Sequence, residues 1–246
     1  MPKDTFFNLP EAKRARIAEA AIDEFAEKGY TGASISRIVA KAKIAKGSFY
    51  QYFDGKTVLF RWLLYDVAAQ RKLATIKDLT PPDPGDFWEQ LSQMFVAGLR
   101  YGLNNPKLSR IAAVLWHPNS DPELQGLVGE FQTLAHRNWK LLLQQGQAMG
   151  QVRTDLDLDM AADFAMAQAM LGLDLAMQRH LGMDMIEFCS HPELEERFPV
   201  DQQRVMVDRI LDLVRRAIGT DGAVEGLQAR IDVDAFNAAM DEAVRG

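Results

Sequence analysis

The chain has 246 residues, of which 48% are hydrophobic, so it is long enough to bury the core of one large domain or two modest ones. Its single cysteine, Cys189, excludes an internal disulfide and a thiolate metal cluster within one chain. The formal net charge of −6 is unevenly spread: residues 1–75 hold 13 Lys and Arg against 8 Asp and Glu, whereas residues 76–246 hold 15 against 26. The acidic net charge therefore does not exclude a nucleic-acid partner, because the basic charge that phosphate binding needs is concentrated in residues 1–75.

Helices are predicted throughout residues 1–75. Asn8 is the expected N-cap of the first, which has Pro10 in its first turn and ends at Gly29. The second follows the cap candidate Ser34 and is only about two turns long, with its apolar residues on one face. These residues are Ile35, Ile38, Val39 and Ala42.

A third helix is expected from about Ala45 to Phe53, and the pair Asp54-Gly55 then breaks the chain before a fourth begins near Lys56. The fourth helix turns four apolar side chains inward. They are Leu59, Trp62, Leu63 and Val67.

The Pro-rich segment 79–85 marks the passage to a second unit. Beyond it the apolar periodicity predicts helices at about 86–104, 106–117, 121–149, 158–181, 200–218 and 223–244. No stretch alternates with period two, so the chain is predicted to be all-α. The expected architecture is an N-terminal three-helix helix-turn-helix domain plus a larger helical ligand-binding and dimerisation domain. The expected bounds are 1–55 for the DNA-binding domain, 56–78 for a connecting helix and 79–246 for the effector and dimerisation domain.

The third helix carries the chemistry of a DNA reader. Two short helices joined by a tight turn can place one helix in a major groove while the other crosses the backbone. With Phe49 and Phe53 facing the core, Gly47 and Gln51 point away from it.

Each outward position then has a chemical role. Lys46 can neutralise phosphate, Gly47 allows close backbone approach, Ser48 and Tyr50 can donate hydroxyls to phosphate oxygens, and Gln51 can contact a base edge. Lys56 adds positive charge at the start of the next helix.

Two stretches carry a family resemblance. Residues 33–42, Ala-Ser-Ile-Ser-Arg-Ile-Val-Ala-Lys-Ala, and residues 46–60, Lys-Gly-Ser-Phe-Tyr-Gln-Tyr-Phe-Asp-Gly-Lys-Thr-Val-Leu-Phe, resemble the TetR family of repressors. The resemblance is close over about residues 11–65, and elsewhere it extends only to a helical body of the right length. It implies a repressor that binds operator DNA, with phosphate or base contacts from Ser34, Ser36, Lys46, Gly47, Ser48, Tyr50, Gln51 and Lys56.

Two positions depart from the family pattern. The family commonly has Gly in the turn and Ser or Thr capping the recognition helix, where this chain has Lys43 and Ala45. A non-Gly residue at positive φ and a missing N-cap each cost on the order of 1 kcal/mol. Lys43 offsets part of this cost if its ammonium reaches a phosphate, which we state as a hypothesis.

The helices at about 158–181 and 200–218 are expected to form a homodimer interface. The first is dense in small residues, namely Ala161, Ala162, Ala165, Ala167, Ala169 and Gly172, which permit close helix approach. The second carries two apolar stripes, Met206-Ile210-Leu213-Ala217 and Val207-Leu211-Val214-Ile218. One face cannot use both, so one stripe is expected inside the chain and the other against a second subunit. The resemblance implies the same pair of helices, and a dimer suits palindromic operators.

A small apolar or amphipathic effector is expected to bind between the body helices. The candidate lining residues are large, aromatic or adaptable side chains. They are Trp88, Phe95, Trp116, His117, Phe131, His136, Trp139, Phe164, Met166, Met170 and Met177. The resemblance does not identify the effector, and each of these side chains also suits an ordinary core.

Enzymatic and metal sites are not indicated. The chain has no GxGxxG, GxSxG, P-loop or HExxH pattern, and Cys189-Ser190-His191 offers too few ligands for a metal. The alternating aspartates at 155–159 suggest turn and N-cap chemistry. No enzyme, cofactor or metal is therefore expected. A dimeric DNA-binding or architectural protein that responds to no small molecule stays open as the alternative.

The location is expected to be cytoplasmic. Residues 1–7 hold no apolar run of signal-peptide length, and the later apolar stretches are interrupted by Gln168, Asp174 and Arg179, so no membrane partner is expected. The helix at 223–244 could pack on the body or extend the dimer interface.

Overall fold

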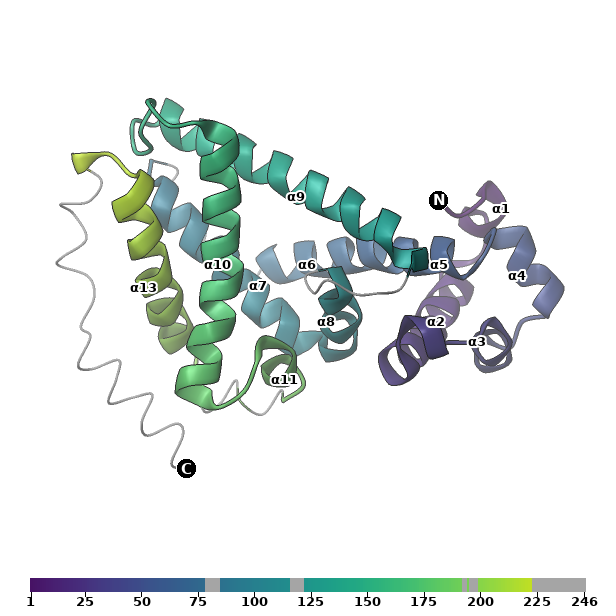
Figure 1. The fold of residues 1–246 in the computed structure, drawn as a ribbon. Coiled ribbons are helices and arrows are strands. Elements are labelled where there is room, and N and C mark those ends of the chain that lie inside the picture. The colour runs from purple at the N-terminus through teal and green to yellow at the C-terminus, as the bar shows by residue number, and fades with distance from the viewer. Residues whose placement is uncertain (78–84, 116–121, 192–193, 195–198, 223–246) are drawn as a thin grey trace. The chain divides into compact units, whose positions relative to one another are not determined.

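The computed structural model describes residues 1–77, 85–115, 122–191, 194 and 199–222. Within these residues the regular elements are helices, and the only β-type pairing is the isolated bridge between Val152 and Gly219 (Figure 1). The chain is therefore all-α, as the periodicity predicts. Contacts divide it into two compact units, Met1–Ala74 with Asn105–Glu130, and Thr75–Asn104 with Phe131–Gly246.

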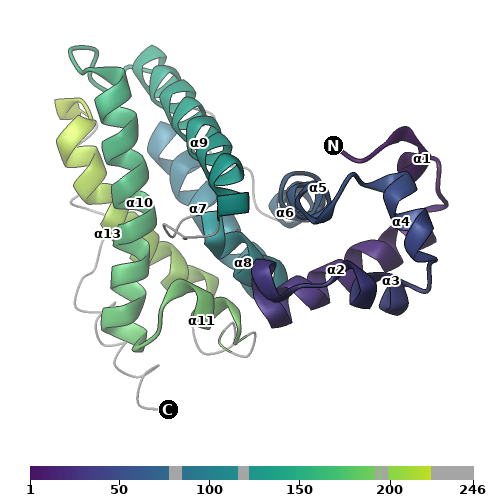
Figure 2. The same ribbon diagram turned by 45° about the vertical axis from the view of Figure 1, so that its right-hand side comes forward.

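The N-terminal unit, here called the head, contains the predicted helix-turn-helix pair and the helices around it. Its elements are α1 (Asp4–Phe7), α2 (Glu11–Gly32), α3 (Ile35–Ala42), α4 (Lys46–Tyr52), α5 (Lys56–Trp62), the π-helical segment η1 (Leu63–Val67), the first part of α6 (Ala68–Lys77), α8 (Pro106–Ala112), the 3₁₀ segment η2 (Ala113–Leu115) and the start of α9 (Pro122–Ala148). Helix α2 packs against both α3 and α8 (Figure 2).

Ion pairs on the surface of α2 join it to the other head helices. Asp23 accepts from Lys41 of α3 at 2.7 Å and from Lys107 of α8 at 2.6 Å. Burial acts to raise the pKa of Asp23, but the hydrogen bonds and charges of the two lysines outweigh it and hold the pKa below its usual value. A further ion pair joins Glu19 of α2 to Arg71 of α6. The packing unit of the head therefore extends beyond residues 1–55.

The second unit, here called the body, is built from α7 (Phe87–Asn104), the rest of α9, α10 (Leu158–Leu181), α11 (Met185–Cys189) and α13 (Val200–Ile218). Helix α13 packs against both α7 and α10. A Cβ at Gly172 of α10 would lie 3.2 Å from Cγ2 of Ile210, so glycine allows the close approach of α10 and α13.

The side chain of Asp157 caps α10 by accepting from the N–H groups of Asp159 and Met160. The alternating aspartates therefore include a cap, as predicted. Asp155 pairs instead with Arg153 at 2.9 Å.

Several predicted element bounds are wrong in detail. Asn8 is not the N-cap of the first long helix: it ends α1, and α2 begins at Glu11 because Pro10 fixes the extended backbone before it. The predicted stop at Gly29 is confirmed: Gly29 has φ 66° and ψ 176°, which breaks the regular helix there, and the rest of α2 to Gly32 is a separate short turn beyond this kink.

Two further differences concern short helices. The loop expected over 182–199 contains α11, whose first turn is capped by the carboxylate of Asp184 and whose Phe188 is fully buried. The helix expected over 106–117 is α-helical to Ala112 and then 3₁₀ to Leu115. The helix predicted at 223–244 lies outside the described residues.

Helix α10 is long and apolar enough by length and composition to cross a membrane, and 33% of its apolar 18-residue stretch is buried. The core helix of a soluble protein passes the same test. Its apolar side chains are divided between two faces. The alanines 161, 162, 165 and 169 are buried, whereas Met160, Phe164, Leu171 and Leu175 are exposed.

Candidate nucleic-acid interface

Helices α3 and α4 are joined by a turn of three residues, 43–45. Lys43 adopts the left-handed conformation with φ 55° and ψ 50°, as expected for the position where the family commonly has glycine. Ala45 is the extended residue before α4 and supplies no side-chain cap. Both departures seen in the sequence are therefore real features of this turn.

Aromatic rings fix α4 from its inner side. Phe49 and Phe53 are fully buried, with ring centroids 5.3 Å apart, as predicted. Phe6 of α1 lies 4.7 Å from Phe53 and 4.8 Å from Trp62, measured between ring centroids. This role of α1 could not be predicted, because a four-residue helix is too short to show a periodic pattern.

The same N-terminal segment binds the carbonyl groups at the end of α4. The Lys3 N–H donates to the Tyr52 carbonyl at 2.9 Å, and Lys3 Nζ donates to the Tyr50 carbonyl at 3.0 Å. The Thr5 hydroxyl donates to the Gln51 carbonyl. These donors satisfy acceptors that a helix end leaves free, so α4 is held in place although its own N-cap is missing.

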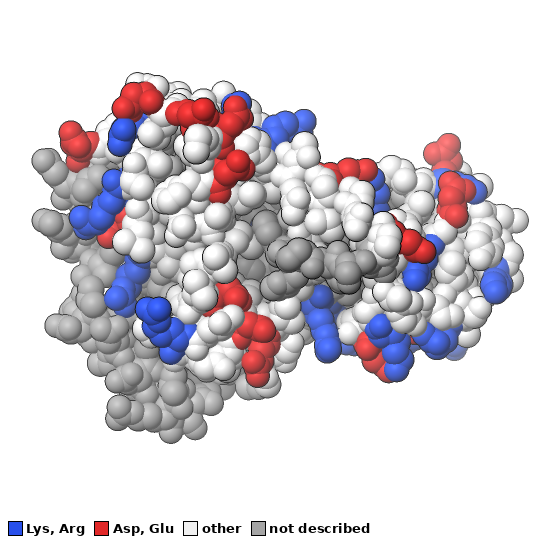
Figure 3. Space-filling view, viewed as in Figure 1, with Lys and Arg blue, Asp and Glu red and all other residues white. Residues whose placement is uncertain are grey.

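The outer face of α4 is polar. Lys46, Gly47, Tyr50 and Gln51 are exposed, with Tyr50 at 48%, and Ser48 is half-buried. Blue side chains lie over α3 and α4 at the right of the space-filling view (Figure 3). This is the arrangement that a groove-reading helix needs, with buried aromatic rings beneath and exposed polar groups above.

The start of α3 is fixed differently from the prediction. The Ser34 side chain makes no cap hydrogen bond; instead its backbone N–H donates to Oε1 of Glu24 at 2.9 Å. Arg37 Nε donates to the same oxygen at 2.8 Å. The Arg37 hydrogen bond, helped by the Ser34 N–H, holds the pKa of Glu24 below its usual value despite its burial. The Ser34 hydroxyl is thus not used as a cap, and Ser36 is exposed on the next turn.

The predicted site residue Lys56 is engaged within the head. Its Nζ donates to the Tyr30 carbonyl at 2.8 Å and lies 4.2 Å from the centre of the Tyr30 ring. Over residues 1–56, by contrast, Arg16, Lys43 and Lys46 make no ion pair or hydrogen bond through their charged groups. Two of these three free cations belong to the turn and the first residue of α4.

The predicted effector-binding residues have varied surroundings in the body. Trp88, Trp139 and Met177 are buried in its hydrophobic core, Phe95 and Met166 pack against that core, and Phe164 is 40% exposed. His136 is bound by Asp163 at 2.7 Å and Asp159 at 3.1 Å. Phe131 and Met170 are half-buried, and Trp116 and His117 lie outside the described residues.

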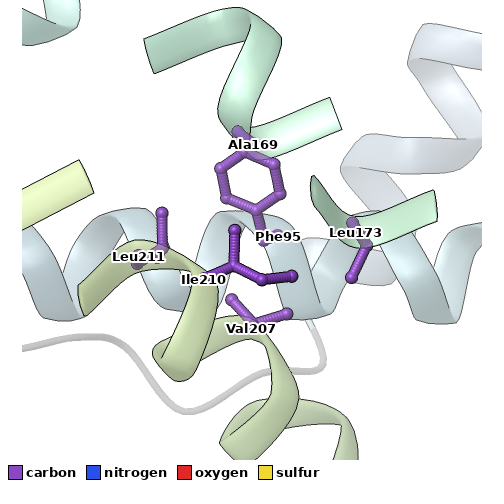
Figure 4. A pocket seen from close by; sticks show the side chains of 6 residues that line it. All are labelled: Phe95, Ala169, Leu173, Val207, Ile210 and Leu211. Carbon is purple, nitrogen blue, oxygen red and sulfur yellow. The ribbon is translucent and has the colours of Figure 1, made fainter. Parts of the chain in front are cut away.

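Phe95 also borders a crevice between α7, α10 and α13, with Ala169, Leu173, Val207, Ile210 and Leu211 (Figure 4). The crevice holds about 160 Å³ of space, none of it wide enough for a water molecule. Of the predicted effector residues that the structure describes, Phe95 is the one that lines this crevice.

The comparisons with known proteins agree on one family. Residues 17–63 match the sequence profile described as "Bacterial regulatory proteins, tetR family". The chain is 28% identical over 149 residues to the "Probable acrEF/envCD operon repressor" of Escherichia coli K12, covering 59% of this chain and 67% of that protein. It is 36% identical over 102 residues to the "HTH-type transcriptional repressor SCO4008" of Streptomyces coelicolor, covering 42% and 48%.

A solved structure extends the similarity to nearly the whole chain. The crystal structure of a TetR family transcriptional regulator from Chloroflexus aurantiacus has a TM-score of 0.64 and 30% identity, and the match covers 89% of this chain and 99% of that one. Proteins of this kind are DNA-binding regulators and not enzymes. The chain belongs to the TetR family of bacterial transcriptional regulators.

Proposed function

We propose that this regulator is a repressor that binds palindromic operator DNA as a homodimer and is released by a small apolar or amphipathic effector. The observation that carries the proposal is the outer face of α4, where exposed Lys46, Tyr50 and Gln51 stand above fully buried phenylalanines. Lys46, Ser48 and Tyr50 are proposed to contact phosphates, and Gln51 a base edge. Gly47 lets the helix backbone approach the DNA.

The remaining proposed contacts lie around α4. Ser34 and Ser36 lie at the start of α3, and their hydroxyl groups are proposed to donate hydrogen bonds to phosphate oxygens. Lys56 is the weakest member of the set, because its ammonium must leave Tyr30 to reach DNA. Residues 1–55 are proposed to read the DNA, 56–78 to connect, and 79–246 to bind effector and dimerise in the cytoplasm.

The exposed apolar stripe of α10 supports the homodimer. Met160, Phe164, Leu171 and Leu175 are between 40% and 73% exposed. At about 100° per residue they fall within roughly 60° of one helix face. On α13, Val207, Leu211, Val214 and Ile218 are buried, as expected for the inner stripe. The other predicted stripe is divided, because Met206 is buried and Ile210 packs against the core, whereas Leu213 is 65% exposed and Ala217 is exposed. A second copy of this surface is the natural cover for it.

The effector is the part of the proposal with least support. The closed crevice at Phe95 favours a second candidate function, a dimeric DNA-binding protein that responds to no small molecule. A ligand-induced rise in melting temperature together with loss of DNA binding separates the two. The repressor proposal expects at least one aromatic or amphipathic compound to give both effects.

The DNA-binding surface is tested with Lys46→Gln. Duplex DNA of mixed sequence is titrated over a salt series, which requires no known operator. Each phosphate contact contributes about 0.9 to the slope of log affinity against log salt, so a dimer that loses two contacts should lose about 1.8. Arg137→Gln is the control, because Arg137 is an exposed cation on α9 that makes no hydrogen bond or ion pair among the described residues. An unchanged slope in Lys46→Gln contradicts the proposed surface.

A further inference from the structure

The C-terminal end of α4 is bound by a segment that precedes α2. An α-helix leaves the carbonyl groups of its last four residues without a partner inside the helix. In α4 the first of these, the Phe49 carbonyl, accepts from the N–H of Phe53 at 2.8 Å. The carbonyls of residues 50–52 accept, in chain order, from Lys3 Nζ, the Thr5 hydroxyl and the Lys3 N–H. Every carbonyl at this helix end is therefore paired, and most of the donors come from the preceding segment.

The segment that supplies these donors, residues 3–9, is itself anchored in the head and is here called the N-terminal strap. Phe6 is fully buried, and its ring centroid lies 4.7 Å from that of Phe53. At the other end of the strap, Arg14 of α2 donates to the Leu9 carbonyl at 3.1 Å. The strap is therefore held by α2 and by the core beneath α4, so it can impose a fixed position on the helix end.

The N-terminal end of α4 has less support. Ala45 supplies no side-chain cap, and Lys43 holds a left-handed conformation that is unfavourable for a residue with a Cβ. The outward residues Tyr50 and Gln51 belong to the opposite end, and it is their own carbonyl groups that the strap side chains bind. The strap thus fixes the backbone from which these two side chains extend.

We propose that Lys3 and Thr5 are positioning residues for sequence recognition: they act through the backbone of α4 and determine where the Gln51 side chain meets a base edge. The inference rests on the reading surface proposed for α4. Hydrogen bonds to base edges require close alignment, whereas flexible side chains reach phosphates from a range of positions. Loss of a strap hydrogen bond is therefore expected to reduce discrimination between DNA sequences more than it reduces general affinity for DNA.

The test compares two duplexes of equal length, one that the parent chain selects from a random library and one of mixed sequence, by fluorescence anisotropy at one salt concentration. Thr5→Val removes the hydroxyl but keeps the shape and charge of the side chain. We expect its Kd for the selected duplex to rise at least about fivefold and its Kd for the mixed duplex to change less than about twofold. Thr5→Ser, which keeps the hydroxyl, should bind both duplexes like the parent chain.

A merely structural role predicts a different result. Unfolding of part of the sample lowers the concentration of active protein and weakens binding to both duplexes by the same factor. Thr154→Val is the matched control, because the exposed Thr154 of the body makes no side-chain hydrogen bond among the described residues. It should leave both dissociation constants unchanged.

Substitutions of Lys3 give a second, independent pair. Lys3→Met removes the donor to the Tyr50 carbonyl, so it should reduce the ratio of the two dissociation constants as Thr5→Val does. Lys3→Arg keeps the charge and a donor, so it should keep most of the parent's discrimination.

The proposal is overturned if Thr5→Val keeps the parent's ratio of the two dissociation constants, whether both rise or neither does, or if Thr5→Ser is as impaired as Thr5→Val. If Thr5→Val does not fold, the comparison of Lys3→Met with Lys3→Arg decides on the same ratio. A parent chain that enriches no sequence contradicts the reading surface of α4 and this inference with it. A parent chain that enriches a sequence which Thr5→Val discriminates equally well contradicts only the role of the strap.

Discussion

Leu171→Ala is expected to weaken self-association of the protein. Leu171 lies on the exposed stripe of α10, with 58% of its surface accessible in the single chain. Burying a whole leucine side chain stabilises by about 1.5–3 kcal/mol, so a partner that covers this share contributes up to about 0.9–1.7 kcal/mol. A twofold axis brings the residue into the interface twice, which gives at most about 3.4 kcal/mol, or roughly 300-fold in the dissociation constant.

Alanine keeps part of the buried surface, so the expected increase in the dimer dissociation constant is about 10- to 100-fold. Sedimentation velocity over a concentration series measures it. Leu141→Ala is the matched control, because Leu141 is 56% exposed but lies on α9, outside the stripe. The reasoning is refuted if both variants dimerise like the parent chain, or if Leu141→Ala is the more damaging of the two.

Two further predictions concern the turn before α4 and the His136 cluster. Lys43→Gly should raise the free energy of unfolding by about 1 kcal/mol in a denaturant titration, because glycine removes the strain of φ 55°. Both Lys43→Gly and Lys43→Ala should flatten the salt dependence of DNA binding if Lys43 contacts phosphate, and an unchanged slope removes that role.

Hydrogen bonds from His136 to Asp163 and Asp159 raise its pKa, so its stabilising effect is present below about pH 6.5 and is lost as the pH rises through the raised folded-state value. The difference in melting temperature between the parent chain and His136→Gln should therefore be largest in acid. A difference independent of pH contradicts the assignment.

The helices with clear local signals were predicted with the bounds that the structure shows. Helix α10 begins after the Asp157 cap and α13 after Pro199, and both run as expected, 158–181 and 200–218. The inward direction of Phe49 and Phe53 followed from their four-residue spacing. Local patterns were sufficient here because the residues that cap a helix or face the core also determine where that helix begins and which side of it is buried.

The features that could not be predicted depend on residues far apart in the chain. Phe6 packs on Phe53, and Glu24 takes the role that the Ser34 hydroxyl was expected to fill. Lys56 turns to Tyr30, which no pattern near Lys56 indicates. The π-helical segment Leu63–Val67 likewise interrupts a helix that its periodicity predicts to be continuous.

The exposed outer face of α4 is the central claim, and selection from a random duplex library tests it most directly. The purified chain and Gln51→Ala each select bound sequences, which are then read in bulk. We predict two inverted half-sites with centres about one helical turn apart, and loss of preference at one base pair of each half-site in Gln51→Ala. A single unrepeated site, or an unchanged preference at every position in Gln51→Ala, contradicts the account.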